Sequence, residues 1–447
     1  MPLLPFAVAE RWREETIISG GAETAETAGP LLFSRPDAQD YLEVAAWYRG
    51  LGDYPSADAV LKRALKDLPA SALSPLVYYY LASDARAEQD ATGARSFAAE
   101  AAAASYHKVF PQRLSDALVL AEAIAQSPVD ARAKYYLGNF FFARGRYEDA
   151  ARLWFQALGG GFDYSVLDRN LGVYAWRVKR DRKAAAGFYA QALQLAPGDY
   201  RLYTDLDEIY AQLGDTAHRA DVFAKAPAAV LDRDTVRVRR ALLDVEQRRY
   251  DQALVLLTGH RFKPWEGGEV VRRIYVRANL EQGKSKLRAR RAQEAEAAFR
   301  RALEYPADLG VGKPDKPHDE QALYWLGEAL EAEGKRNGAR QAWGEAVAEG
   351  KAAGPFGRDS SGEPQVCAAL ALDKLGRTSE GQKILNDLAS GPSKKNAGKN
   401  AGAYDFYVAG LAERARDHAH QAGSDFRRAL ELDPSLWEAR LEAGNRE

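Results

Sequence analysis

The chain has 447 residues and a formal net charge of −1 at pH 7, and 28% of its residues are charged, with the two signs mixed. Because the charges nearly cancel, no overall field attracts nucleic acid or an anionic membrane, and we expect neither as a partner. Cys367, the single cysteine, excludes an intrachain disulfide and a zinc–cysteine cluster, and we expect it to be a buried apolar residue.

No stretch of the sequence approaches the ~18 apolar residues of a membrane span. The first residues lack the basic start and the long apolar core of a signal peptide. We therefore expect a cytoplasmic protein.

Residues 1–37 form an irregular N-terminal segment, polar and rich in small residues between Gly20 and Thr27. Residues 38–128 follow as N-terminal repeats. Tyr41, Val44 and Tyr48 mark a first helix at helical spacing, and a second helix ends at Pro69. The remainder of this range is degenerate, and we expect two further helix pairs there.

Residues 129–260 hold the clearest repetition. Leu137 and Gly138 recur 34 residues later as Leu171 and Gly172, which is a period typical of helical repeats. The second of these repeats contains a one-residue slip in the turn 179–183. In the next repeat Asp207 stands where a small residue is usual, and we expect it to face a partner or water.

Residues 261–390 contain further repeats, a long helix near 269–289 and a Gly/Pro-rich loop at 307–318. Residues 391–402 have the composition of a flexible linker. Residues 403–447 form the last repeat, after which Trp437–Leu441 begins another helix. Its charged face suits a terminal cap.

The motif that runs through Gly138, Gly145, Tyr147, Ala150 and Trp154 resembles the tetratricopeptide repeat (TPR) superfamily. This resemblance implies an all-α, right-handed α-solenoid of about ten TPR-like helix pairs. Such scaffolds bind proteins or peptides in a groove lined by their first helices.

Three segments, 169–172, 262–269 and 305–310, narrow the resemblance to the TPR half of uncharacterised bacterial proteins that carry an N-terminal domain of unknown function. That resemblance implies a carbohydrate-related setting. It carries over no catalytic residue and no cofactor, so we do not expect an enzyme.

The groove positions of the central repeats carry polar and aromatic side chains. They are Arg132, Tyr135, Asn139, Arg169, Asn170, Trp176, Arg201 and Glu208. Asn139, Asn170 and Arg201 resemble part of a clamp that closes on a peptide carboxylate, whereas Tyr135 and Asp205 depart from it. The alternatives are a groove for another polar ligand and asparagines that brace the repeats.

A second candidate patch consists of His260, Trp265 and Glu266. An aromatic ring beside a carboxylate suits a sugar ring. The alternative is a helix start, in which Gly267 and Gly268 allow the turn and Trp265 packs. The histidine spacing indicates no metal site.

The leading hypothesis is therefore a TPR scaffold that binds a peptide or partner protein in its groove. The alternative is an accessory half of a carbohydrate-active protein, which packs on a catalytic domain or contacts sugar. Self-association into a homodimer is a further alternative.

Overall fold

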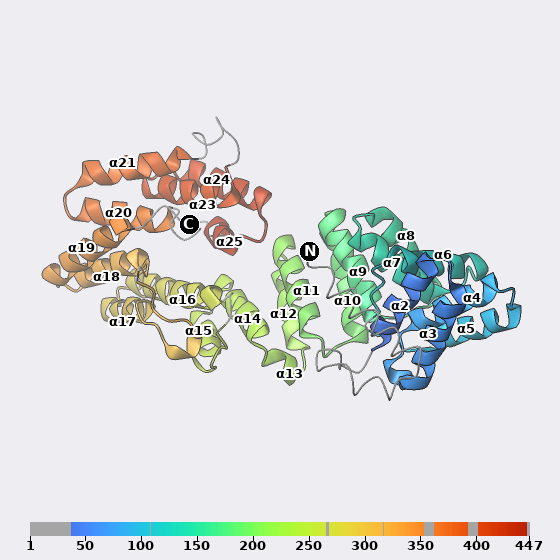
Figure 1. Cartoon of the computed structure of the whole chain (residues 1–447). Helices are drawn as coiled ribbons and strands as arrows, with labels where there is room; N and C mark the ends of the chain where they lie inside the picture. The colour runs from blue at the N-terminus through green and yellow to red at the C-terminus, as the bar shows by residue number, and fades with distance from the viewer. Residues whose placement is uncertain are drawn as a thin grey trace, which may run out of the picture. The chain divides into compact units, whose positions relative to one another are not determined.

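The computed structural model describes residues 37–107, 109–264, 268–315, 317–352, 362–391 and 401–444, and no β-strand occurs within them. The chain divides into two compact units, Met1–Leu195 and Ala196–Glu447. Consecutive helices pack against each other as antiparallel pairs (Figure 1). The predicted all-α solenoid of TPR-like helix pairs is confirmed. None of the helices in the described ranges combines the length and apolar character needed to cross a membrane.

Within its described residues, the N-terminal unit contains four helix pairs and one single helix. Its helices are α2 (Ala38–Gly50), α3 (Tyr54–Asp67), α4 (Pro75–Ala87), α5 (Ala91–Ala103), α6 (Leu114–Gln126), α7 (Ala131–Ala143), α8 (Tyr147–Gly159), α9 (Ser165–Val173) and α10 (Arg182–Leu195). The expectation of two helix pairs in the degenerate range is wrong in part. The helices α4 and α5 form one pair, but α6 packs on α4 and α7 without a second helix of its own.

The one-residue slip is visible in the backbone. The helix α9 continues into a π-helical turn, Tyr174–Val178, which absorbs an extra residue. Gly145 has a φ of +75° after α7, and Arg180 takes the same left-handed conformation, with a φ of +59°, after the π-helical turn. These positions lie 35 residues apart, whereas Gly138 and Gly172 lie 34 apart.

The C-terminal unit contains six more pairs, which brings the described total to ten. Its helices are α11 (Tyr200–Leu213), α12 (Thr216–Ala224), α13 (Ala228–Leu231), α14 (Asp234–Glu246), α15 (Tyr250–Thr258), α16 (Gly268–Arg288), α17 (Ala292–Ala302), α18 (Glu320–Ala332), α19 (Arg336–Ala352), α20 (Glu363–Lys374), α21 (Thr378–Ala389), α23 (Ala403–Ala415), α24 (Ala419–Leu432) and α25 (Trp437–Gly444). The predicted long helix is α16.

In half of the described pairs, a glycine on the first helix and an aromatic ring on the second explain how the pair closes. The glycine has no Cβ, so the ring packs directly on the first helix. The five pairs of this kind are Gly138 with Trp154, Gly172 with Tyr189, Gly283 with Phe299, Gly327 with Trp343 and Gly410 with Phe426. All five rings are buried, and burying an aromatic ring is a large part of the stability of a pair.

Asp207 does not face a partner or water. Its side chain is fully buried and accepts hydrogen bonds from Arg219 Nε (2.7 Å) and Arg239 Nε (2.5 Å). The expectation was wrong because two arginines from α12 and α14 compensate the buried charge. Asp207, at a position where a small residue is usual, therefore takes part in an internal ion pair.

Candidate functional site

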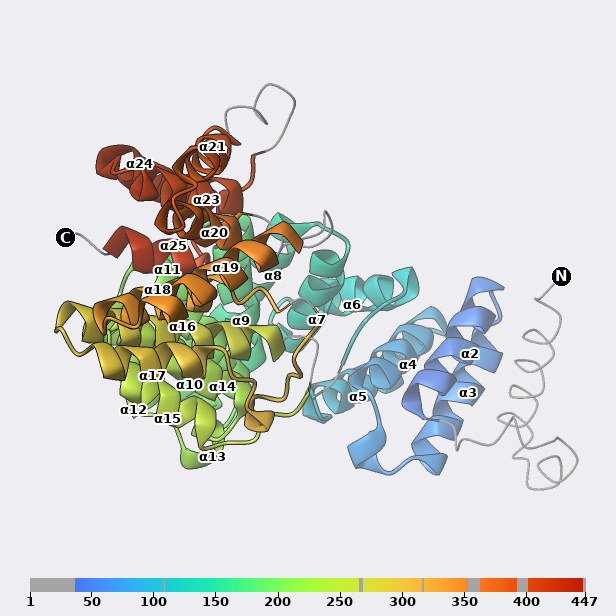
Figure 2. The ribbon, with the colours of Figure 1, turned by 90° about the vertical axis from the view of Figure 1, so that its left-hand side faces the viewer.

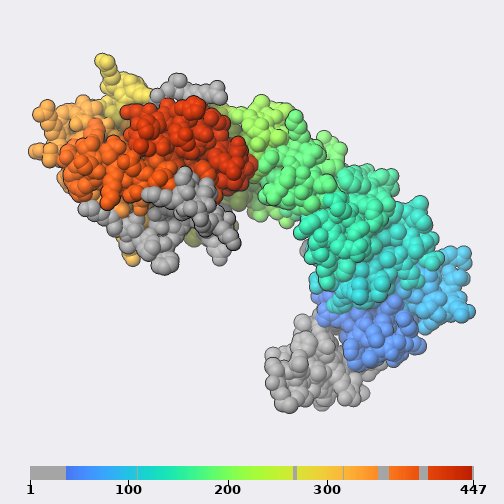
Figure 3. All heavy atoms as spheres, turned by 90° about the horizontal axis from the view of Figure 1, so that it is seen from above, coloured from blue at the N-terminus to red at the C-terminus, as the bar shows by residue number. Residues whose placement is uncertain are grey.

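The C-terminal unit contains a cavity of about 700 Å³. It lies on the inner face of the unit, which we define as the face formed by α16, α18, α20 and α23, the first helices of four successive pairs. The loop 303–319 and the helix α25 complete its wall. In Figures 1 and 2, α25 lies between the α23–α24 pair and α16. Orange and red atoms of α18–α24 form a continuous surface in Figure 3.

One face of α16 supplies the charged wall of the cavity. Arg272, Arg273, Val276, Arg277 and Leu280 all line it. Their spacing of three and four residues places them in neighbouring rows on one side of the helix. This helix therefore presents three guanidinium groups toward the same space.

Arg272 is 8% exposed and has donors that the protein does not use. Its Nη2 donates to the carbonyl of Ala302 (2.8 Å) and lies 3.5 Å from Asp319 Oδ1, and its guanidinium carbon lies 4.1 Å from the ring centre of Tyr305. Among the described residues, no acceptor bonds its Nε or Nη1. Both atoms are buried, so Arg272 contributes positive charge to the wall rather than exposed donors.

The loop 303–319 is held in place by its own backbone and by a neighbouring segment. The amide of Phe262 donates to the carbonyl of Asp308 (2.8 Å), and Gly310 has a φ of +70°. A Cβ on Gly310 would lie 2.8 Å from the carbonyl oxygen of Phe262, so only glycine allows this approach. At the end of the loop, burial raises the pKa of Asp319.

The helix α25 is anchored by buried ion pairs. Arg277 and Arg414 both bond Glu442, and Arg273 bonds Glu438. Glu438 is 4% exposed and Glu442 is 6% exposed. Burial alone would raise the pKa of Glu442, but the charges of Arg277, Lys284 and Arg414 outweigh it and lower the pKa to about 2. The charged side chains that suggested a terminal cap thus form ion pairs within the protein, and the role of a cap stays a prediction.

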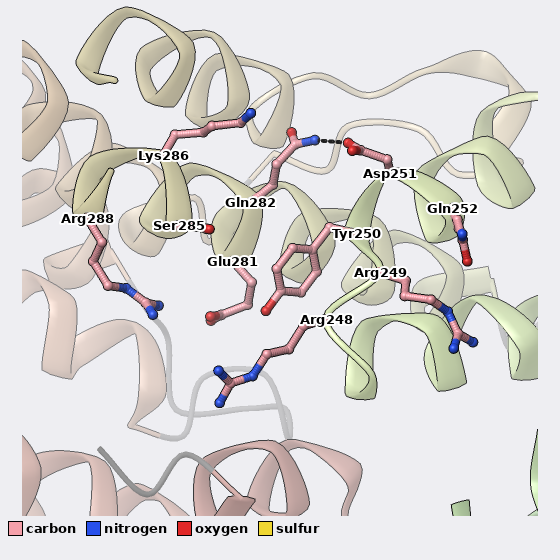
Figure 4. A pocket seen from close by; sticks show the side chains of 10 residues that line it. All are labelled: Arg248, Arg249, Tyr250, Asp251, Gln252, Glu281, Gln282, Ser285, Lys286 and Arg288. Atoms are coloured by element: carbon pink, nitrogen blue, oxygen red, sulfur yellow. Dashed lines mark hydrogen bonds between the residues drawn. The ribbon is translucent and has the colours of Figure 1, made fainter. Parts of the chain in front are cut away.

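A smaller hollow of about 360 Å³ lies between the α14–α15 turn and the second half of α16 (Figure 4). Gln282 donates to Asp251 across it. Glu281 is bonded by Lys284 (2.9 Å), and Arg249 pairs with Asp244. Its charged groups thus serve the packing of the repeat, and we place the candidate site in the larger cavity.

The structure brings together three of the predicted groove residues. Asn139 Oδ1 accepts from Asn170 Nδ2 (3.1 Å) and from Trp154 Nε1 (3.1 Å), and Trp154 Nε1 also lies 3.3 Å from the carbonyl of Tyr135. Tyr135 and Trp176 are both buried. These contacts favour the alternative in which the asparagines brace the repeats.

The remaining groove residues also have contacts within the protein. Arg132 donates to the carbonyl of Ala104 (2.7 Å), and Arg169 is half-buried on α9. On α11 of the C-terminal unit, the exposed Arg201 bonds the cap residue Asp199, and Glu208 accepts from Arg239 (2.6 Å). The binding role of this groove stays a prediction.

In the second candidate patch, His260 Nε2 lies 2.6 Å from Asp234 Oδ1, and the amide of Lys263 donates to Asp234 Oδ2 (3.0 Å). Although burial raises the pKa of Asp234, these bonds outweigh it, and the net pKa is lowered. His260 therefore ties the loop to the start of α14. Trp265 and Glu266 lie outside the described residues.

Cys367 is buried as predicted, and burial raises the pKa of its thiol to about 12. No group of three or more histidine, cysteine, aspartate or glutamate side chains in the described part of the chain could hold a metal ion. The sequence reasoning missed Arg272, Arg273 and Arg277. The signal was present in the arginine spacing on the long helix and in the matching spacing of Glu438 and Glu442.

The tetratricopeptide repeat family model matches residues 112–161 and 280–357. Among solved structures, yeast Tom70 is similar, with 14% identity, coverage of 98% of this chain and 93% of that chain, and a TM-score of 0.34. Naa15/Naa10 bound to HypK-THB has 12% identity, 91% and 65% coverage, and a TM-score of 0.32.

The C-terminal part of a TPR repeat-containing protein from Cytophaga hutchinsonii has 14% identity, 66% and 94% coverage, and a TM-score of 0.26. The identities and TM-scores of all these structures are low. We therefore take neither a partner nor an activity from them.

Proposed function

We propose that this chain is a protein-interaction scaffold that holds a segment of a partner protein on the inner face of its C-terminal unit. The observation that carries the proposal is the cavity of about 700 Å³ along α16. This volume lies within the range of ligand-binding pockets, and stacked helical repeats use such faces to bind partners.

The chemistry of the cavity wall suits a peptide. Val276, Leu280 and Ala322 offer apolar surface, and Arg272, Arg273 and Arg277 supply positive charge to the wall. An extended peptide brings both apolar side chains and a row of backbone carbonyl oxygens.

The test is a selection of short displayed peptides on the full chain, followed by fluorescence anisotropy of each selected peptide. Gly312 lines the cavity, and a Cβ there would meet nothing within 4 Å, so Gly312→Trp blocks the space without a clash at the Cβ. Gly187 on α10 is open in the same way and provides the matched control, Gly187→Trp.

We expect Gly312→Trp to weaken the binding of the selected peptides by about tenfold or more, which corresponds to ~1.4 kcal/mol of binding free energy. Gly187→Trp should leave their binding unchanged. The proposal fails if no peptide binds, or if the selected peptides bind the Gly312→Trp chain as well as the wild type.

The groove predicted around Asn139 and Asn170 has a separate test. If this groove binds the peptides instead, Asn170→Ala will weaken peptide binding and Gly312→Trp will not. The carbohydrate alternative rests on Trp265 and Glu266, and it stays a prediction.

A further inference from the structure

The helix α25 begins another repeat, but no second helix follows it within the described residues. It contains eight residues, and an isolated helix of that length is not stable in water. Its conformation therefore depends on what it contacts. The first two residues of the helix, Trp437 and Glu438, line the cavity described above, as does Leu436 just before them.

Two parallel rows of side chains attach α25 to the inner face. The acidic row is Glu438 and Glu442, which lie four residues apart and pair with Arg273 and Arg277, also four residues apart on α16. Four residues are about one helical turn, so each carboxylate of one helix meets a guanidinium of the other.

The apolar row is Trp437 and Leu441, again four residues apart. Both side chains pack against the cluster that α14, α15 and α16 form around Val238, Leu242 and Ile274. The guanidinium carbon of Arg273 also lies 5.8 Å from the ring centre of Trp437. The two rows together define a pattern of recognition for one helix.

A third contact lies at the side of α25. Arg440 Nε donates to Glu246 Oε1 (3.1 Å), and Glu246 is also bonded by Arg219. The carboxylate that pairs with α25, Glu246, thus belongs to α14. The guanidinium groups that pair with α25 belong to α16 and, in the case of Arg414, to α23. All charged groups of α25 between Glu438 and Glu442 have partners.

The remaining apolar contacts of α25 are with the α23–α24 pair. Ala439 is fully buried in the cluster around Tyr407 and Phe426, and Leu436 and Ala443 pack against that cluster. On the side of α16, Trp437 and Leu441 are only partly buried. The contact with α16 is thus made by the two rows alone.

We propose that α25 is a displaceable occupant of a helix-binding groove, and that a partner helix with the same two rows takes its place. Such a helix carries two carboxylates one turn apart and, one position before each of them, a large apolar residue. This inference rests on the proposed function and names the class of partner for the same face. Binding of a helix through apolar anchors at this spacing is a general mode of recognition.

The probe is a fluorescein-labelled peptide of residues 433–444 with blocked ends, and it is titrated into the full chain. In the wild type its site is occupied by α25. In the Leu441→Ala chain the attached α25 binds less well, while the groove itself is unchanged. We expect the probe to bind the Leu441→Ala chain about tenfold more tightly, because a larger fraction of these molecules has an open groove.

The charge rows are tested by exchange within the Leu441→Ala background. A probe with Glu438→Lys should bind about tenfold more weakly, and Arg273→Glu in the chain should restore its binding. Arg273 is 44% exposed at its side chain, so the introduced carboxylate stays in contact with water. Equal binding of the two probes would overturn the inference.

Hydrogen exchange provides a measurement that does not depend on a variant. The amides of α25 should exchange faster than those of α24, because α25 leaves the face without unfolding of the neighbouring repeat. Equal protection of α24 and α25, together with no gain of probe binding in the Leu441→Ala chain, would show a permanent structural helix.

Two further outcomes separate this inference from the proposed function. If selected peptides are blocked by Gly312→Trp but ignore both the 433–444 peptide and Arg273→Glu, the proposed function stands and this inference fails. If a concentration-dependent dimer forms by exchange of α25, the occupant is a second copy, and the assignment of a partner helix is overturned.

Discussion

A Cβ on Gly138 would lie 2.5 Å from the indole nitrogen of Trp154. This contact joins the two helices of the pair α7–α8, and the same arrangement recurs in four further pairs. The glycine is therefore a requirement of the packing between helices, because any side chain there displaces a buried ring.

We predict that Gly138→Ala destabilises the N-terminal unit by about 1–3 kcal/mol through overpacking. Gly187→Ala is the matched control, since Gly187 lies in the middle of α10, is exposed to solvent and has open space where a Cβ would lie. It should stabilise the protein by roughly 0.5–1 kcal/mol. Thermal unfolding and hydrogen exchange of α7 and α8 measure both effects. Equal changes in the two variants would contradict the prediction.

We predict that Asp207→Asn destabilises the protein by about 1.5–3 kcal/mol, because it removes the buried charge that Arg219 and Arg239 share, while Glu246 still pairs with Arg219 and Glu208 with Arg239. The control is Asp221→Asn, which removes the exposed partner of Lys225 (3.4 Å). The control should cost less than about 1 kcal/mol. The free energy of unfolding in urea decides between them, and a small effect at Asp207 would contradict its role as an internal anchor.

Asp168 predicts a pH dependence of stability. Burial, aided by the nearby Asp163, raises its pKa to about 6. Between the ordinary pKa of an aspartate, ~3.9, and about 6, the folded state keeps a proton that the unfolded state has released. The contribution of Asp168 to stability is therefore greatest at low pH and decreases as the pH rises through this window.

The test compares the wild type with Asp168→Asn, which cannot ionise. We expect the variant to have the higher melting temperature at pH 7.5, and the difference to become small at pH 4.5. Because the wild type and the variant have all other carboxyl groups in common, the difference between their melting temperatures as a function of pH reports Asp168 alone. A difference that does not vary with pH would refute the prediction.

We predict that Asn139→Ala lowers the stability of the protein more than Asn170→Ala does. Asn139→Ala removes the acceptor for two donors, although Trp154 keeps the carbonyl of Tyr135, and we expect a loss of about 1–2 kcal/mol. Asn170→Ala removes one donor and leaves Asn139 bonded to Trp154, so the loss should be smaller. Thermal unfolding of both variants tests the order, and the reverse order would contradict the bracing role.

Local features of the fold could be predicted from the sequence. The distance of 34 residues from Gly138 to Gly172 indicated the helix pairs, and the ring at Trp154 indicated how a pair closes. These features depend on residues that are neighbours in the sequence, where spacing reports geometry directly. The π-helical turn at Tyr174–Val178 was visible only as a slip of one residue in the period.

The candidate site could not be predicted because its parts are distant in the sequence. Arg277 and Glu442 are 165 residues apart, and each alone is typical of a charged helix face in water. The same holds for Asp207, whose partners lie on two other helices. The sequence shows the charges, but only the superhelical path of the C-terminal unit determines which of them meet.

The return of α25 to α16 also affects how the C-terminal unit folds. Stacked repeats fold quickly because nearly all their contacts are local, and a low contact order gives a fast search. The pair Arg277–Glu442 and the pair Arg440–Glu246, 194 residues apart, form only after α25 has been made. During synthesis, the inner face of α16 would therefore stay open until α25 emerges, and the docking of α25 would be slower than the folding of each repeat.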